Sequence, residues 1–192
     1  MSDRAAGRII AGSARGIHLE APGPGTRPMG DRVKQTLFAI LEPDLPGARV
    51  LDLFAGSGAA GLEALSRGAA HATFVDTDRT AAGVIASNLD RTHLAGPQAS
   101  IVRADAIDWL RDREPNDSTA FGIVIVDPPY ADPELLGASL EAVGRHLAAR
   151  ARVAVKHFWR DRPPTTVGLL ASERERRFGE TTLTFYRRQE DR

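Results

Sequence analysis

Apolar runs and helical patterns alternate along most of this chain. From residue 49 onward, short apolar runs fall at 50–54, 72–75, 100–103, 121–126 and 151–155. Between these runs, apolar residues recur at helical spacing near 58–67, 79–91, 106–112 and 133–149. Short apolar strands that alternate with helices are typical of a mostly parallel sheet covered by helices on both faces. The pattern therefore predicts an α/β fold.

The N-terminal region follows a different pattern. Two short extended runs surround small residues within 8–22, which predicts a β-hairpin, and the Pro- and Gly-rich stretch 22–30 predicts a loop. Asp31 is then expected to N-cap a helix over 31–41, in which most apolar residues share one face.

The C-terminal region also departs from strand–helix alternation. Residues 174–188 read RERRFGETTLTFYRR, which is two extended runs around a glycine. This predicts an antiparallel pair of strands at the edge of the sheet. We therefore expect an N-terminal β-hairpin extension, residues 1–30, and one main domain, residues 31–192.

Composition excludes several kinds of site. The 192 residues include no cysteine, which rules out disulfides, thiolate metal ligands and a cysteine nucleophile. The five histidines are scattered without metal-ligand spacing, so we expect no metal site. No apolar run reaches the length of a membrane span, and the N-terminus lacks the apolar core of a signal peptide. We therefore expect a cytoplasmic protein that does not enter a membrane.

The net charge of zero hides an uneven distribution of charges. Residues 1–35 hold six Lys and Arg against three Asp and Glu, and residues 150–192 hold eleven against six. Residues 36–149 hold eight against sixteen. An acidic centre between basic ends suits a cationic or polyhydroxy ligand in the core and a polyanion at the flanks, although solvated surface charge would give the same counts.

A glycine motif follows the first apolar run of the main domain. In LDLFAGSGAAGLEAL, residues 51–65, Gly56, Gly58 and Gly61 have the G-x-G-x-x-G spacing of dinucleotide-binding turns, and Asp76 stands where such folds carry a ribose-binding acid. Asp52, however, precedes the glycines, where a carboxylate would repel a pyrophosphate. The glycines alone therefore leave the ligand open.

An acid stands at or just beyond each of four predicted strand ends. Ligands of open α/β sheets bind at this edge, so one cleft is expected to contain Asp52, Asp76, Asp105 and Asp127. S-adenosylmethionine suits these acids because it offers an ammonium group to Asp52, ribose hydroxyls to Asp76 and an adenine amino group to Asp105. The glycines would let the backbone approach its methionine portion. Each acid taken alone could instead cap a helix or bond a loop amide.

A proline box follows the fourth of these strands, Asp127-Pro128-Pro129-Tyr130. Proline has no backbone N–H, so the Asp127 carboxylate and the Pro128 carbonyl are acceptors on a stiff turn. A planar amino group could donate one hydrogen to each of them and be oriented toward a methyl sulfonium. Tyr130 could stack on the base that carries the amino group. We interpret the box as the catalytic site, and a plain turn after a strand is the alternative.

These motifs resemble the amino-group methyltransferases of nucleic acids, and one branch matches nearly the whole chain. The segments similar to the RsmD family, bacterial 16S rRNA guanine-N2 methyltransferases, are RIIAGSARG, GTRPMGDRVKQTLF, LDLFAGSGAAGLEALSRGA, VDPPY and FGETTLTFY. The resemblance implies a Rossmann-like class I methyltransferase fold and S-adenosyl-L-methionine as cofactor, with S-adenosyl-L-homocysteine as product. It also implies a monomer that needs no metal and acts on 16S rRNA in an assembled or partly assembled small ribosomal subunit (30S).

The functional residues of that family are carried onto this sequence position by position. The catalytic residues become Asp127, Pro128, Pro129 and Tyr130. The cofactor-binding residues become Asp52, Phe54, Ala55, Gly56, Ser57, Gly58, Asp76, Asp105 and Ala106. The chain departs from the family at Met29-Gly30, where relatives have Thr and a small polar residue, and at Lys156, where many relatives carry an acid at the end of the fifth strand.

The basic residues of the N-terminal region are candidates for RNA contacts. Phosphate contacts position a nucleic acid without reading its sequence. The candidates are Arg8, Arg15, Arg27, Arg32 and Lys34. For each of them, solvated surface charge is the alternative. The target guanine is expected to leave its stack unless the RNA already splays it out.

Other functions compete with this interpretation. Methylation of DNA at adenine N6 or cytosine N4 uses the same chemistry, but the chain shows no separate target-recognition domain. An NAD-dependent oxidoreductase explains the glycines but neither Asp52 nor the proline box. A non-catalytic RNA-binding assembly factor would have no need of the intact box. Methylation at C5 of pyrimidines normally uses a cysteine nucleophile, which this chain lacks.

Overall fold

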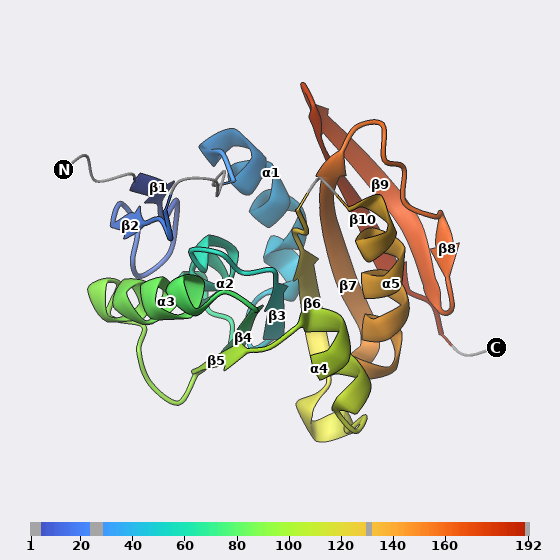
Figure 1. Ribbon diagram of the computed structural model, residues 1–192, viewed down its shortest axis with the longest axis horizontal. Coiled ribbons are helices and arrows are strands. Elements are labelled where there is room, and N and C mark those ends of the chain that lie inside the picture. The colour runs from blue at the N-terminus through green and yellow to red at the C-terminus, as the bar shows by residue number, and fades with distance from the viewer. Residues whose placement is uncertain (1–4, 24–28, 130–131, 191–192) are drawn as a thin grey trace.

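The computed structural model describes residues 5–23, 29–129 and 132–190. Within these residues, eight strands form one sheet in the order β5-β4-β3-β6-β7-β10-β9-β8 (Figure 1). The strands are β3 (Arg49–Leu53), β4 (His71–Asp76), β5 (Ala99–Arg103), β6 (Phe121–Val126), β7 (Leu147–Phe158), β8 (Thr166–Val167), β9 (Leu170–Phe178) and β10 (Thr181–Arg188).

The sheet is parallel except at its C-terminal edge, which confirms the predicted topology. Strands β5, β4, β3, β6 and β7 run parallel, and β10 pairs antiparallel with both β7 and β9. The boundary between the last helix and β7 was predicted wrongly, because the helix ends at Val143 and not at residue 149. Leu147 pairs with Phe121 of β6, so the strand ladder overrides the helix propensity of the Ala-rich segment that follows Leu147.

Helices cover both faces of the sheet (Figure 1). The helices are α1 (Asp31–Leu41), α2 (Ala59–Ser66), α3 (Arg79–Arg91), α4 (Ala106–Asp112) and α5 (Pro133–Val143), with short 3₁₀ turns at Glu42–Asp44, Asp117–Thr119 and Gly144–His146. Because successive strand residues point to opposite faces, Val50 and Ile123 pack in the layer of α1, α2 and α3. Their neighbours Leu51 and Val124 pack in the layer of α4 and α5.

The start of α1 differs from the sequence prediction. Gly30 occupies the N-cap position without a side-chain bond, and Asp31 is the first helical residue. The Asp31 carboxylate pairs with the Arg8 guanidinium, with 3.3 Å between Nε and Oδ2. Asp31 therefore ties the helix to the N-terminal strand and does not cap it, although its negative charge still suits a helix N-terminus.

The N-terminal region forms the predicted hairpin and packs against the main sheet's helices. Strands β1 (Ala5–Arg8) and β2 (His18–Glu20) pair antiparallel. Asn88 of α3 binds the backbone of Glu20 in both directions, accepting its N–H at 2.8 Å and donating to its carbonyl at 3.0 Å. The same amide donates to the carbonyl of Ser57 in the glycine loop at 2.9 Å. Asn88 thus connects the hairpin with that loop.

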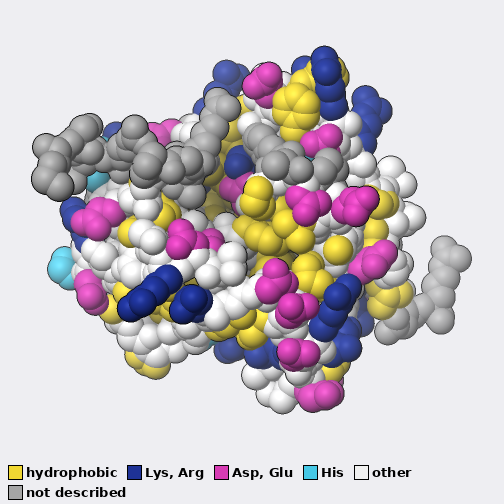
Figure 2. Space-filling view, viewed as in Figure 1, with side chains coloured by type: hydrophobic (Ala, Val, Ile, Leu, Met, Phe, Trp, Pro, Cys, Tyr) yellow, Lys and Arg dark blue, Asp and Glu magenta, His cyan; other side chains and the backbone are white. Residues whose placement is uncertain are grey.

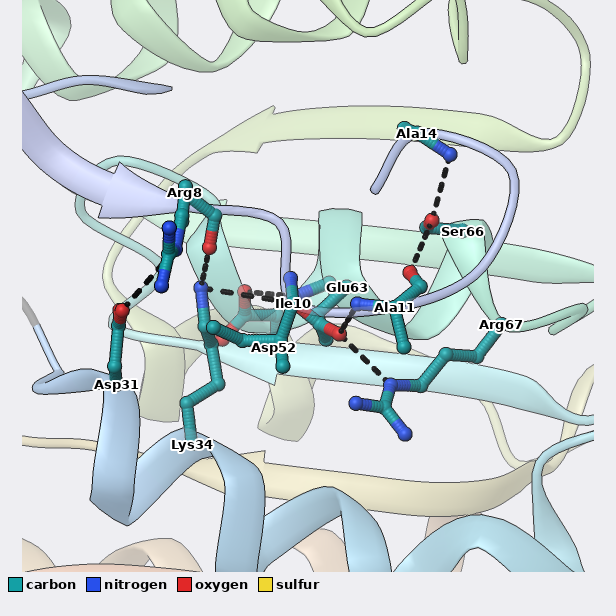
Figure 3. A network of polar contacts seen from close by, with 11 residues as sticks. Arg8, Ile10, Ala11, Ala14, Asp31, Lys34, Asp52, Glu63, Ser66 and Arg67 are labelled. Atoms are coloured by element: carbon teal, nitrogen blue, oxygen red, sulfur yellow. Dashed lines mark hydrogen bonds and ion pairs between the residues drawn. The ribbon is translucent and has the colours of Figure 1, made fainter. Parts of the chain in front are cut away.

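A buried carboxylate fixes the segment between the two hairpin strands (Figure 3). Glu63 of α2 is fully buried and accepts the N–H groups of Ile10 at 2.7 Å and Ala11 at 3.0 Å. Its charge is balanced by Arg67, whose Nε donates at 2.8 Å, and by the Lys34 ammonium at 3.6 Å. A buried carboxylate is costly unless it is paired and hydrogen-bonded in this way. The hairpin, α1 and α2 therefore meet at one ionic centre.

Two glycines of the hairpin loop provide a test of this docking. Gly12 and Gly16 share a left-handed φ of 86°, but a Cβ on Gly12 would lie 1.8 Å from the Ser66 carbonyl oxygen, whereas one on Gly16 would meet nothing within 4 Å. Gly16→Ala is expected to cost about 1 kcal/mol, the strain of a left-handed alanine. Gly12→Ala is expected to cost more than about 3 kcal/mol or to displace the loop, because backbone atoms must move. Urea unfolding measures both, and equal losses would contradict the docking.

Candidate active site

The four acids predicted at strand ends lie along one edge of the sheet. Strands β5, β4, β3 and β6 are neighbours in that order. Asp105, Asp76, Asp52 and Asp127 therefore follow one another along the edge where these parallel strands end. Ligands of open α/β sheets bind at this edge. The structure brings the candidate residues together as the sequence predicted.

Asp52 is a buried carboxylate with little compensating charge. Only 2% of its surface is exposed, and its Oδ2 accepts the N–H of Gly61 at 2.8 Å. The pKa of Asp52 is raised to about 8, chiefly by burial and also by the nearby negative charges of Asp127 and Asp76, against the opposing effect of the Gly61 N–H. A cation placed at Asp52 would relieve this cost, whereas an anion would increase it.

The backbone between β3 and α2 takes left-handed turns. Phe54 has φ of 61°, Gly56 has 55° and Gly58, at the N-cap of α2, has 76°. A left-handed Phe costs about 1–3 kcal/mol, and such strain concentrates at ligand sites. At Gly61 a Cβ would lie 2.3 Å from the Phe74 ring, so this glycine allows close packing of α2 on β4. The first two glycines of the motif thus shape the turn, and the third serves helix–sheet packing.

Asp76 and the glycine loop hold each other in place. Oδ2 of Asp76 accepts the Gly56 N–H at 2.8 Å, and Oδ1 accepts the Asp78 N–H at 2.9 Å. The Ala55 N–H donates to the carbonyl of Val75 at 3.1 Å. Ser57 is buried within the same loop. These bonds fix the carboxylate of Asp76 beside the loop that would carry the methionine portion of a cofactor.

Two acids near the site cap helices, which is the structural alternative to ligand binding that the sequence also allowed. Asp78 accepts the Thr80 N–H at 2.8 Å at the start of α3. Oδ1 of Asp105 accepts the N–H groups of Ile107 at 2.9 Å and Asp108 at 3.0 Å at the start of α4. Asp105 is exposed, and Ala106 behind it is buried. Capping fixes the Asp105 carboxylate at the cleft edge, which is compatible with a second partner there.

The proline box contains an ion pair that the sequence did not reveal. Oδ1 of Asp127 accepts a hydrogen bond from the Lys156 ammonium at 2.5 Å. Burial raises the pKa of Asp127, and the positive charge of Lys156 works against that rise. The Asp127 N–H donates to the Leu53 carbonyl at 3.3 Å, which holds the box against the end of β3. The only sequence signal for this pair was a basic residue at the end of the fifth strand.

Of the other three residues of the box, the structure describes Pro128 and Pro129. Pro128 is buried and Pro129 is exposed. Tyr130 lies outside the described residues. The Pro129 carbonyl accepts the Asp132 N–H at 3.3 Å, which turns the chain toward α5.

The candidate RNA contacts divide into different environments. Arg8, Arg15 and Arg32 are exposed, and Arg27 lies outside the described residues. Lys34 is 1% exposed, and its ammonium is held by Glu63 and by the carbonyl of Arg8 (Figure 3). Burial lowers the pKa of Lys34. The prediction that Lys34 binds RNA phosphate is therefore wrong, because its charge is used inside the protein.

The fold is that of the Rossmann-like methyltransferases. A solved structure described as the putative methyltransferase yhhF from Escherichia coli aligns with a TM-score of 0.82 and 35% identity, covering 95% of this chain and 97% of that one. The chain belongs to the family described as "Conserved hypothetical protein 95", whose model matches residues 7–187. This membership confirms the resemblance to the RsmD family.

Curated relatives cover nearly the whole chain. The "Putative rRNA methyltransferase YlbH" of Bacillus subtilis (strain 168) is 37% identical over 94% of this chain and 98% of its own length. The "Ribosomal RNA small subunit methyltransferase D" of Escherichia coli (strain K12) is 37% identical over 95% of this chain and 90% of its own length.

The described residues contain neither a helix that could span a membrane nor a group of side chains that could hold a metal ion. Among the described residues, no helix has the length and apolarity needed to cross a membrane. Within the same ranges, no three His, Cys, Asp or Glu side chains lie together in a way that could hold a metal ion.

Proposed function

We propose that this protein transfers a methyl group from S-adenosyl-L-methionine to the exocyclic N2 of a specific guanine in 16S rRNA. The observation that carries this proposal is the buried Asp52 between the charges of Asp76 and Asp127, on the same edge as the proline box. Such a site favours a cationic cofactor. The substrate is supported by relatives named as small-subunit rRNA methyltransferases.

The residues of the cleft fit the parts of this cofactor. Asp52 would pair with its ammonium group, which would offset the cost of burying the carboxylate. Asp76, fixed by the glycine loop, would accept hydrogen bonds from the ribose hydroxyls. Asp105 would accept from the adenine amino group beside Ala106. When bound, the cofactor supplies an electrophilic methyl group on its sulfonium.

Asp127 would orient the guanine amino group. Because Lys156 already occupies Oδ1, the second carboxylate oxygen and the Pro128 carbonyl would accept the two amino hydrogens. This fixes the nitrogen lone pair toward the methyl group, and such positioning supplies much of the rate of a one-step displacement. After transfer, the excess proton on nitrogen passes to Asp127 or to solvent. Tyr130 is proposed to stack on the guanine.

The biological setting is part of the same proposal. We place the reaction in the cytoplasm, on an assembled or partly assembled small ribosomal subunit, with the protein acting as a monomer. The extension of residues 1–30 would help to engage RNA, and Arg8, Arg15 and Arg27, together with Arg32 of α1, are the proposed contacts for phosphate groups.

Mass-spectrometric mapping of 16S rRNA tests the proposal directly. RNA from cells with and without this protein is expected to differ by one N2-methylguanine, and an inactive Asp127→Asn copy should not restore it. A full set of guanine methylations in cells lacking the protein would contradict the proposal.

Replacing Lys156 is expected to shift the pH dependence of the reaction toward higher pH. Lys156 opposes the raised pKa of Asp127, so Lys156→Met should raise that pKa further and leave less of the carboxylate ionised at neutral pH. The acid limb of the kcat/KM profile should therefore move to higher pH. Lys156→Arg keeps the cation and should keep the profile. An unshifted acid limb in Lys156→Met would show that Lys156 does not control Asp127.

A further inference from the structure

Three arginines near the active site rest on aromatic rings. The guanidinium carbon of Arg177 lies 4.1 Å from the centre of the Trp159 ring, and that of Arg160 lies 4.8 Å from the same ring. Arg32 of α1 lies 5.9 Å from the centre of the Phe178 ring. All three arginines are exposed. They come from three separate segments, namely α1, the turn after β7 and the end of β9.

These residues lie at the catalytic edge of the sheet. Trp159 follows Lys156, the partner of Asp127, by three residues, and its N–H donates to the Glu180 carbonyl at 2.9 Å. The turn between β9 and β10 therefore lies at the end of β7 that adjoins the site. Figure 1 shows this hairpin tip rising beside α1, and Figure 2 shows basic, apolar and acidic side chains side by side over it.

These arginines have no ion-pair partner among the described residues. Among the described residues, no carboxylate forms an ion pair with Arg32, Arg160 or Arg177, although Asp161 and Glu180 belong to the same turns. A cation–π contact orients a guanidinium without cancelling its charge. Arg177 is fixed further, because its Nε donates to the Gly179 carbonyl at 2.8 Å.

Two arginines of β7 and β10 that lie farther from the hairpin tip have a different environment. Arg152 pairs with Asp44 and with Glu173, and Arg187 pairs with Glu173 at 3.1 Å. Their charges are balanced within the fold. This environment distinguishes Arg152 and Arg187 from Arg160 and Arg177, which lie at the hairpin tip next to the active site.

We infer that Trp159, Arg160 and Arg177, together with Arg32, form a second RNA-binding surface that takes phosphate groups of the strand carrying the target base. Guanidinium groups are suited to phosphate in charge and geometry. The surface lies beyond β7, whereas the N-terminal hairpin packs over α2 and α3 on the other side of β6. RNA bound to both would cross the edge at Asp127. This inference rests on the proposed rRNA substrate.

Binding measurements on the folded full-length chain test the surface. The Arg160→Gln/Arg177→Gln double variant should bind 16S rRNA and unmodified small subunits about tenfold more weakly, with the slope of log Kd against log salt reduced by about 1.5, the loss of two phosphate contacts. The loss should fall on KM more than on kcat. Arg111→Gln is the control, because this exposed arginine lies in the last turn of α4, at the opposite edge of the sheet, where its carbonyl accepts a hydrogen bond from Arg145. Calorimetric binding of S-adenosylhomocysteine confirms that each variant is folded.

Cross-linking identifies the partner. With a photoreactive phenylalanine analogue in place of Trp159, cross-links to 16S rRNA support the inference, and cross-links to a ribosomal protein alone overturn it. Unchanged Kd and salt slope in the double variant also overturn it. If wild-type protein methylates small subunits while the variants bind normally, only this inference fails. If wild-type protein transfers no methyl group to them, the proposed function fails.

Discussion

Asp127→Asn is expected to lower the rate of methyl transfer about 10³-fold while cofactor affinity stays within a few fold of wild type. Asparagine keeps the shape of the side chain but replaces one carboxylate oxygen with an amide nitrogen. It therefore loses either the acceptor for the substrate amino group or the acceptor for the Lys156 ammonium, which lies 2.5 Å from Oδ1. The lost charge also removes the ion pair between residue 127 and Lys156.

Single-turnover transfer of labelled methyl groups to unmodified small subunits measures this effect, and calorimetry with S-adenosylhomocysteine measures cofactor binding. Asp132→Asn is the matched control. It makes the same chemical change five residues away, where Asp132 caps α5 by accepting the Leu135 N–H at 3.2 Å, and asparagine caps helices equally well. Undiminished transfer by Asp127→Asn would remove Asp127 from the mechanism.

Asp52→Asn is expected to weaken the cofactor and to stabilise the free protein. Loss of the carboxylate removes the partner of the cofactor ammonium, which should cost about 10²-fold in affinity. Asparagine still offers an oxygen to the Gly61 N–H but carries no charge into a site where only 2% of the residue is exposed. The free variant should therefore be more stable at pH 7.5 by roughly 2–4 kcal/mol.

The pH dependence of stability has a defined sign. The pKa of folded Asp52, about 8, exceeds the ordinary value of an unfolded aspartate. Its protonated form therefore contributes stability that is fully present below the unfolded pKa and is lost as pH rises through about 8. Urea unfolding of wild type between pH 4 and 8.5 should show this loss, and Asp52→Asn should not. Asp90→Asn, on the exposed face of α3, is the control. Parallel pH profiles in wild type and Asp52→Asn would contradict the raised pKa.

Local signals predicted several elements to the residue. Helices α3 and α4 begin and end where the sequence indicated, because Asp78 and Asp105 cap them and the apolar spacing between is helical. The four acids were also found from sequence, since parallel strands that alternate with helices must end at one edge. Both inferences use neighbours in the sequence or a general rule of topology.

Long-range contacts explain the errors. Asp31 satisfied the local signature of an N-cap, but Arg8 draws its carboxylate into an ion pair. The Ala-rich start of β7 has helix propensity, but Leu147 finds a strand partner in Phe121. Lys34 belonged to a basic cluster in sequence, but Glu63 of α2 holds it inside the protein. In each case a residue more than twenty positions away decided the outcome.

The sequence by itself determined the chemistry of this protein. The order of strands and helices, the glycine turn and the Asp127-Pro128-Pro129-Tyr130 box predicted a methyltransferase fold with its acids along one edge. Only the tertiary structure decided what each charge does. It buries Lys34 against Glu63, pairs Lys156 with Asp127, and places the Arg177 guanidinium over the Trp159 ring. The reason is physical: the state of an ionisable side chain depends on its burial and on charges close in space, and neither can be read from neighbours in the chain.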